Sequence, residues 1–180
     1  MSDVISSRHM IRLDHKPQLF SFRVAGLVFQ NGHLLVNRST TDRYWALPGG
    51  RVEIGESSEE TILREIKEEL HVTARIERLL WSAESFFPYG EYDAHELAFY
   101  YLIHLEQAFP FHETDIVHRV VDGVEIEFRW LPATASALKA NDLRPAFIAQ
   151  RIETLPHRHE HLIVREGKTP DTLQSGPAYD

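Results

Sequence analysis

Residues 50–72 read GRVEIGESSEETILREIKEELHV, and this stretch decides the fold. Placed on a helix at about 100° per residue, its apolar side chains share one arc and three of its glutamates share another. The reason is that neighbours three and four positions apart lie above one another on a helix. The apolar arc holds Ile62, Leu63, Ile66 and Leu70, and the acidic arc holds Glu65, Glu68 and Glu69. The pattern predicts an amphipathic helix that packs its apolar arc against a core.

The acidic arc also predicts a bound cation. Like charges at this helical spacing repel by about 0.2–0.5 kcal/mol per pair. No basic residue occupies the centre of that arc, so a metal ion is the expected counter-charge. Carboxylate oxygens are hard ligands, and they suit Mg²⁺ or Mn²⁺ better than zinc.

The start of the helix is marked as well. Ser57 and Glu60 have the spacing of a capping box, and Glu59 adds negative charge to the first turn, where the helix dipole favours it. Just upstream, residues 47–50 read LPGG, a tight loop that is expected to bring backbone carbonyls near the acidic arc.

Taken together, this stretch resembles the signature of the MutT-like Nudix hydrolase superfamily. That signature is a glycine, five residues, a glutamate, seven residues, and then R-E-aliphatic-x-E-E-x-G-aliphatic. The matching residues are Gly50, Glu56, Arg64, Glu65, Ile66, Glu68, Glu69 and Val72. His71 stands where the family has glycine; we interpret it as a modest backbone cost in a left-handed conformation that histidine tolerates, with the metal site retained.

The resemblance implies an α/β (α+β) sandwich, with a mixed β-sheet between helices, over about residues 18–155. It implies a hydrolase that uses Mg²⁺ (or Mn²⁺) to cleave the phosphoanhydride of a nucleoside diphosphate linked to another moiety. Nucleotide sugars, ADP-ribose and nucleoside triphosphates are the substrate classes. Glu65, Glu68 and Glu69 would be metal ligands, with the Gly49 carbonyl as a further candidate. Arg64 would orient the carboxylates, Glu56 among them.

Other roles stay open at this point. The general base is one of the signature glutamates, Glu96 or Glu113. Substrate-binding candidates near the signature are Arg38, Arg43 and Tyr44, whereas the neighbouring Trp45 is more often a core residue. Aromatic residues in 86–92 would stack a nucleobase or simply pack a loop. His157, His159 and His161 alternate, which favours a solvated strand over a transition-metal site.

Composition bounds the remaining possibilities. The chain has 180 residues, of which 43% are hydrophobic and 26% charged, as in a single globular domain over residues 1–180. A net charge of −8 disfavours nonspecific nucleic-acid binding. Without cysteine there is no disulfide, thiolate zinc site or cysteine nucleophile. The sequence shows no signal-peptide or membrane-spanning apolar run, so a cytoplasmic protein is expected.

Along the chain we expect a strand, an Asn31-Gly32 hairpin turn of type I′ and a return strand before the signature helix. The expected strands are 20–29, 33–37, most of 73–87, 95–105, 124–131 and 157–164, the expected helices 133–140 and 144–154, and the expected loops 88–93 and 107–118. Residues 168–180 are expected to form a loose tail.

Two functional hypotheses remain. The first is an active hydrolase, and the second is a catalytically silent module that binds a nucleotide on the same fold. The first is favoured because every carboxylate of the signature is present. A homodimer is compatible with the resemblance.

Overall fold

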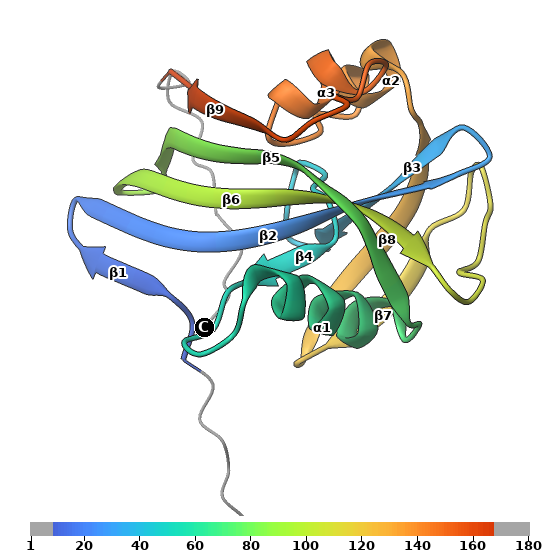
Figure 1. The fold of residues 1–180 in the computed structure, drawn as a ribbon, viewed down its shortest axis with the longest axis horizontal. Helices are drawn as coiled ribbons and strands as arrows, with labels where there is room; N and C mark the ends of the chain where they lie inside the picture. Colours follow the sequence, from blue (N-terminus) through green and yellow to red (C-terminus); the bar gives the residue numbers. More distant parts are fainter. Residues whose placement is uncertain (1–8, 168–180) are drawn as a thin grey trace, which may run out of the picture.

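The computed structural model describes residues 9–167, which form one large mixed sheet with helices on both of its faces (Figure 1). In chain order the elements are β1 (Arg12–His15), β2 (Gln18–Gln30), β3 (His33–Ser39), β4 (Gly49–Arg51), α1 (Ser58–Leu70), β5 (Ala74–Tyr89), β6 (Tyr92–Leu105), β7 (Val117–Val121), β8 (Val124–Pro132), α2 (Ala135–Ala140), α3 (Phe147–Arg151) and β9 (Glu160–Arg165).

The strand order is β7-β8-β3-β2-β6-β5-β9, and β1 and β4 also pair with β2. The pairs β2–β6 and β5–β9 are parallel, and the remaining pairs are antiparallel. A parallel pair cannot be joined by a tight hairpin, and long connections carry the chain between these strands. The sheet is therefore mixed, as predicted.

Two apolar clusters cover the two faces of the sheet. One contains Ile62, Ile66 and Leu70 of α1, and the other contains Leu138 of α2 and Phe147 of α3. Apolar residues on opposite faces of the same strands supply the rest of each cluster, because successive side chains of a strand point to opposite faces. The predicted α/β/α sandwich is confirmed.

Strand β2 organises the site because two different strands pair along it. Its end, at Phe29 and Gln30, pairs with β3, whereas its middle, Arg23 to Ala25, pairs with β4. The tight Asn31-Gly32 turn that joins β2 to β3 has φ values of 50° and 74°, which confirms the predicted hairpin. As a result, the short strand β4 lies against the centre of the sheet, directly before α1.

Two expected loops are wrong. Strand β5 continues to Tyr89 and β6 begins at Tyr92, so only a short turn with Gly90 at φ 57° separates them. The second expected loop, 107–118, ends in β7, which begins at Val117 and pairs with β8. In both places pairing with the next strand overrides the turn-forming residues that suggested a loop.

The late helix is shorter than expected. It spans Phe147–Arg151, with Ala146 at its N-cap and no side-chain hydrogen bond that caps it. The residue before a proline disfavours the helical conformation, and Arg144 precedes Pro145, so the helix begins beyond that pair. The last strand is also shorter and begins at Glu160.

The prediction for residues 168–180 falls outside the described residues. Within residues 9–167, no helix is both long and apolar enough to cross a membrane.

Candidate functional site

Helix α1 begins and ends as its sequence predicts. The Ser57 side chain accepts a hydrogen bond from the Glu60 N–H, and the Glu60 carboxylate accepts one from the Ser57 N–H at 2.8 Å, which completes the capping box. At the other end His71 adopts φ 58°, the left-handed conformation, and donates its backbone N–H to the Lys67 carbonyl. The helix is thus fixed at both ends.

The apolar arc of α1 is buried, with one exception. Ile62, Ile66 and Leu70 are fully buried, whereas Leu63 is 36% exposed. Leu63 lies at the margin of the arc, so the prediction that it belongs to the core-facing set is wrong. The remaining three residues hold α1 against the sheet and aim its glutamates at β4.

Glu69 is the most deeply buried carboxylate of the acidic arc, at 6% exposure. Its Oε2 accepts hydrogen bonds from the Gly49 N–H at 3.3 Å and from the Asn37 amide at 3.3 Å. Burial, and next the charge of Glu65, raise the pKa of Glu69 well above its usual value. Removing a carboxylate from water this completely is costly unless a cation or a proton neutralises it.

Glu65 lies against Gly50. A Cβ atom at position 50 would stand 2.2 Å from the Glu65 Oε1, so only glycine leaves space for this carboxylate. Burial raises the pKa of Glu65, while the neighbouring Arg64 opposes the shift. The first glycine of the signature therefore receives the first glutamate of the acidic arc.

Arg64 links the remaining signature carboxylates. Its guanidinium donates to Glu56 at 2.8 and 2.9 Å, to Glu65 at 2.9 Å and to Glu68 at 3.1 Å. The Glu53 carboxylate also lies 3.5 Å away. These partners raise the pKa of Arg64 and, from the other side, Arg64 lowers the pKa of Glu56. The pairing of Arg64 with Glu56 expected from the signature is present.

The donor set suits a hard divalent cation, although the ligands are not yet grouped around it. Within residues 9–167 no three His, Asp or Glu side chains already converge on one cation position. Arg64 holds Glu65 and Glu68, and the Gly49 N–H and Asn37 hold Glu69. Yet Glu69 is withdrawn from water and Glu65 partly so, and the charge of Glu65 raises the pKa of Glu69. Two such carboxylates fit Mg²⁺ or Mn²⁺.

The charge of Arg23 on β2 acts both on glutamates of α1 and on a glutamate of β6. Its charge lowers the pKa of Glu65, of Glu69 and of Glu96 against the upward effect of burial. Glu96 lies 3.8 Å from the Arg23 Nε and 3.5 Å from the Ser21 hydroxyl. Sequence reasoning missed Arg23 and also Asn37, because both lie inside strands and outside any motif. The one sequence signal for Asn37 is that a polar asparagine follows the apolar residues of β3.

The three predicted substrate-binding residues lie at and beyond the end of β3. Arg38 donates to Glu127 at 2.8 Å and lies over the Trp45 ring, 4.4 Å from its centroid. Arg43 is exposed and Tyr44 is half-buried, in the segment between β3 and β4. Trp45 is 4% exposed and belongs to the core, as its residue type suggests.

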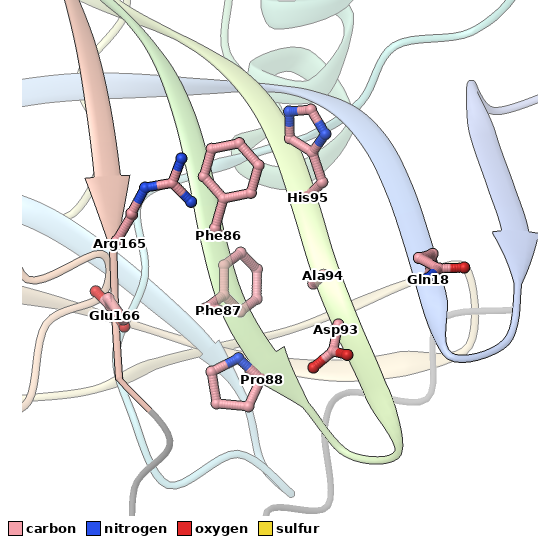
Figure 2. A pocket seen from close by; sticks show the side chains of 9 residues that line it. All are labelled: Gln18, Phe86, Phe87, Pro88, Asp93, Ala94, His95, Arg165 and Glu166. Carbon is pink, nitrogen blue, oxygen red and sulfur yellow. The ribbon is translucent and has the colours of Figure 1, made fainter.

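The aromatic residues of 86–89 lie in β5, and Phe86 is already stacked. Its ring lies 4.4 Å from the His95 ring on β6, and the Arg165 guanidinium on β9 lies 4.3 Å from its centroid. Figure 2 shows these three side chains next to one another on adjacent strands. They line a pocket of about 480 Å³ together with Gln18, Phe87, Pro88, Asp93, Ala94 and Glu166. Because the Phe86 ring already contacts His95 and Arg165, its arrangement supports a packing role over the stacking of a nucleobase.

The alternating histidines do not gather. The ring of His159 lies before β9 and contacts the Ser82 hydroxyl at 3.0 Å, whereas His161 contacts the Glu84 carboxylate at 2.8 Å. His157 is exposed. This arrangement agrees with solvated histidines better than with a shared metal ion.

The model of the NUDIX domain family matches residues 20–150, so the chain belongs to the Nudix family. A Bacillus subtilis protein, YjhB, whose name assigns it provisionally as an ADP-ribose pyrophosphatase, is 44% identical over 57 residues, covering 32% of this chain and 27% of that protein. The Escherichia coli 8-oxo-dGTP diphosphatase is 30% identical over 78 residues, or 41% of this chain and 57% of that protein. The chain thus matches less than two thirds of the length of either relative.

Solved structures agree on the fold. The crystal structure of a MutT NUDIX hydrolase from Burkholderia pseudomallei superposes with a TM-score of 0.54 at 24% identity, covering 76% of this chain and 98% of that one.

Proposed function

We propose that the protein is a hydrolase that uses a divalent metal ion, Mg²⁺ or Mn²⁺, to cleave the phosphoanhydride of a nucleoside diphosphate linked to another moiety. The observation that carries the proposal is the pair of the buried Glu69 and the half-buried Glu65 beside Gly49 and Gly50. Two neighbouring carboxylates that are at least half-buried and whose pKa values are both raised are poorly explained as a structural device. They are well explained as ligands for a cation.

When bound, the metal ion would neutralise phosphate charge and lower the pKa of an attacking water. Glu65, Glu68 and Glu69 would hold it, with the backbone of Gly49 as a further candidate ligand. Arg64 would release Glu65 and Glu68 toward the metal while its fork stays on Glu56, to which it donates twice. The general base would be one of these glutamates or Glu96. Glu113 is exposed, unlike these glutamates, and is a weaker candidate for the base.

The substrate class is supported by the relatives. One is named for ADP-ribose and another for 8-oxo-dGTP, and both compounds contain a nucleoside diphosphate. We propose the same class here, as a small-molecule partner, and we propose that the residues around Arg38, Arg43 and Tyr44 contact the part of the substrate beyond its phosphates. We also propose that the enzyme acts in the cytoplasm.

The experiment is a panel of ADP-ribose, nucleotide sugars and nucleoside triphosphates, with and without Mg²⁺. We expect turnover that requires the metal and that falls steeply in Glu65→Gln and Glu69→Gln. Arg158→Gln, a change at an exposed site, is the control and should retain wild-type rates. Nucleotide binding without turnover by the wild type would instead support the silent binding module.

A further inference from the structure

Arg51 of β4 is half-buried, and among residues 9–167 it forms no salt bridge. It pairs across the strands with Arg23, so the two arginine side chains leave the same face of the sheet. Like charges in this position destabilise a sheet. An arrangement of this kind calls for an anion.

The nearby carboxylates are already committed. Asp14 binds Arg12 at 3.0 Å, and Glu96 lies 3.8 Å from the Arg23 Nε. Among the described residues, the hydrogen-bond contact of Arg51 is the Met10 sulfur at 3.6 Å, and its Nε is buried without a partner. Arg51 therefore has no salt bridge of its own within the described residues, and Glu96, the carboxyl that acts on it, lies beside Arg23.

A second orphaned group lies on the same face of the sheet. Ser85 of β5 pairs with Glu96 of β6, and its hydroxyl is buried and lacks a hydrogen-bond partner within the described part of the chain. Buried polar atoms are nearly always satisfied in folded proteins, so the Arg51 Nε and the Ser85 hydroxyl, on one face of the sheet, mark a place where a ligand belongs.

Arg23 and Arg51 differ in which carboxylates they act on. Arg23 acts on Glu65 and Glu69 and also on Glu96. The carboxyl that acts on Arg51 is Glu96. Gly50 faces Glu65, and the next residue of an extended strand points to the opposite face, so Arg51 points away from Glu65. A single phosphate therefore cannot contact both.

We propose that Arg51, with Arg23, binds a negatively charged substrate group that lies beyond the diphosphate at the α1 carboxylates, which gives a preference for substrates with a third anionic group. A nucleoside triphosphate meets this requirement, whereas a nucleoside diphosphate joined to a neutral hexose does not. A guanidinium suits this role because it remains charged and donates to phosphate through a planar fork. The inference rests on the proposed hydrolase function.

The test compares two substrates of the same nucleoside, the triphosphate and the diphosphate hexose, with Mg²⁺ and the full chain. In Arg51→Gln, KM for the triphosphate should rise about tenfold or more, since one charge-assisted contact is lost. The diphosphate hexose should change by less than about twofold, because it never reaches Arg51. Arg51→Lys, which keeps the charge, should recover part of the loss, and Arg158→Gln should change neither substrate.

A binding measurement separates this inference from the proposed function. Inorganic tripolyphosphate in metal-free buffer, followed by calorimetry, should bind the wild type and lose affinity in Arg51→Gln. A wild type that turns over no substrate but shows this loss would overturn the hydrolase and retain the anion site. Equal tripolyphosphate affinity in both proteins, or an equal loss for both substrates in the kinetic test, would overturn the anion site.

Discussion

Glu65 occupies the space that a side chain at Gly50 would need, with its Oε1 2.2 Å from the position of a Cβ. Gly50→Ala should therefore displace this carboxylate while leaving the sheet paired, because position 50 lies inside β4. Misplacing a reacting group by about 1 Å costs about 100-fold in rate, and we expect a fall in kcat of that order. Steady-state kinetics with Mg²⁺ measures it, and circular dichroism verifies the fold.

Gly167→Ala is the matched control for this change. A Cβ at Gly167 meets no atom within 4 Å, so this variant should keep wild-type activity. An active Gly50→Ala with unaltered kcat would show that the position of Glu65 is not needed for turnover.

The metal-free protein should lose stability as the pH rises. Below the usual pKa of about 4.5, Glu69 is protonated in both the folded and the unfolded states; above it, the unfolded state ionises while the buried carboxyl in the folded state resists. The folded state therefore holds more protons, and its free energy of unfolding falls from about pH 4.5 upward, through the raised pKa. Urea unfolding in metal-free buffer across this range measures the slope.

Glu69→Gln removes this ionisation and should flatten the profile, with the remaining slope due to Glu65 and Glu96, whose pKa values burial also raises. Added Mg²⁺ should stabilise the wild type more at neutral pH than at acidic pH, because it binds the charged carboxylates. Parallel pH profiles of the wild type and Glu69→Gln would contradict this account.

Local signals carried the prediction of α1 and its surroundings. The capping box at Ser57 and the left-handed His71 depend on a few neighbouring residues, which the sequence displays directly. The Asn31-Gly32 turn is local in the same sense. For these elements, the residue types and the observed backbone agree because no distant contact competes with them.

Strand pairing decided what the residue types alone could not. Strand β7 forms because β8 pairs with it, and β5 continues through Pro88 because β6 runs beside it. The opposition of Arg23 and Arg51 is of the same kind, since a register between β2 and β4 brings together residues far apart in the chain. A single sequence displays the carboxylates of the candidate site, but not which arginines the strand register brings near them.

Arg64→Lys should damage both stability and catalysis. Lysine presents a point charge in place of a planar fork and cannot donate to Glu56, Glu65 and Glu68 together. Because the Arg64 side chain is only 17% exposed, the lost charge-assisted bonds should lower the free energy of unfolding by about 2 kcal/mol. Urea denaturation measures this value, and kinetics with Mg²⁺ should show a lower kcat.

The control for Arg64 is Arg75→Lys, at an exposed ion pair with Glu77. Exposed pairs contribute little, so its effect should stay below about 0.5 kcal/mol. If the two arginine variants behaved alike, Arg64 would be one more surface charge and its linking role would be wrong.

His71→Gly should stabilise the protein. His71 holds φ 58° at the end of α1, a conformation that costs a residue with a Cβ roughly 1–2 kcal/mol and glycine nearly nothing. The unfolded chain gains freedom from the glycine and offsets part of this, which leaves an expected gain of about 0.5–1 kcal/mol. Urea unfolding of His71→Gly and His71→Ala isolates the effect, because alanine keeps the Cβ and should bring no gain. Since His71 is exposed and follows the acidic arc, kcat should be unchanged in both variants. Equal stability of the two would mean that the left-handed backbone carries no strain at this position.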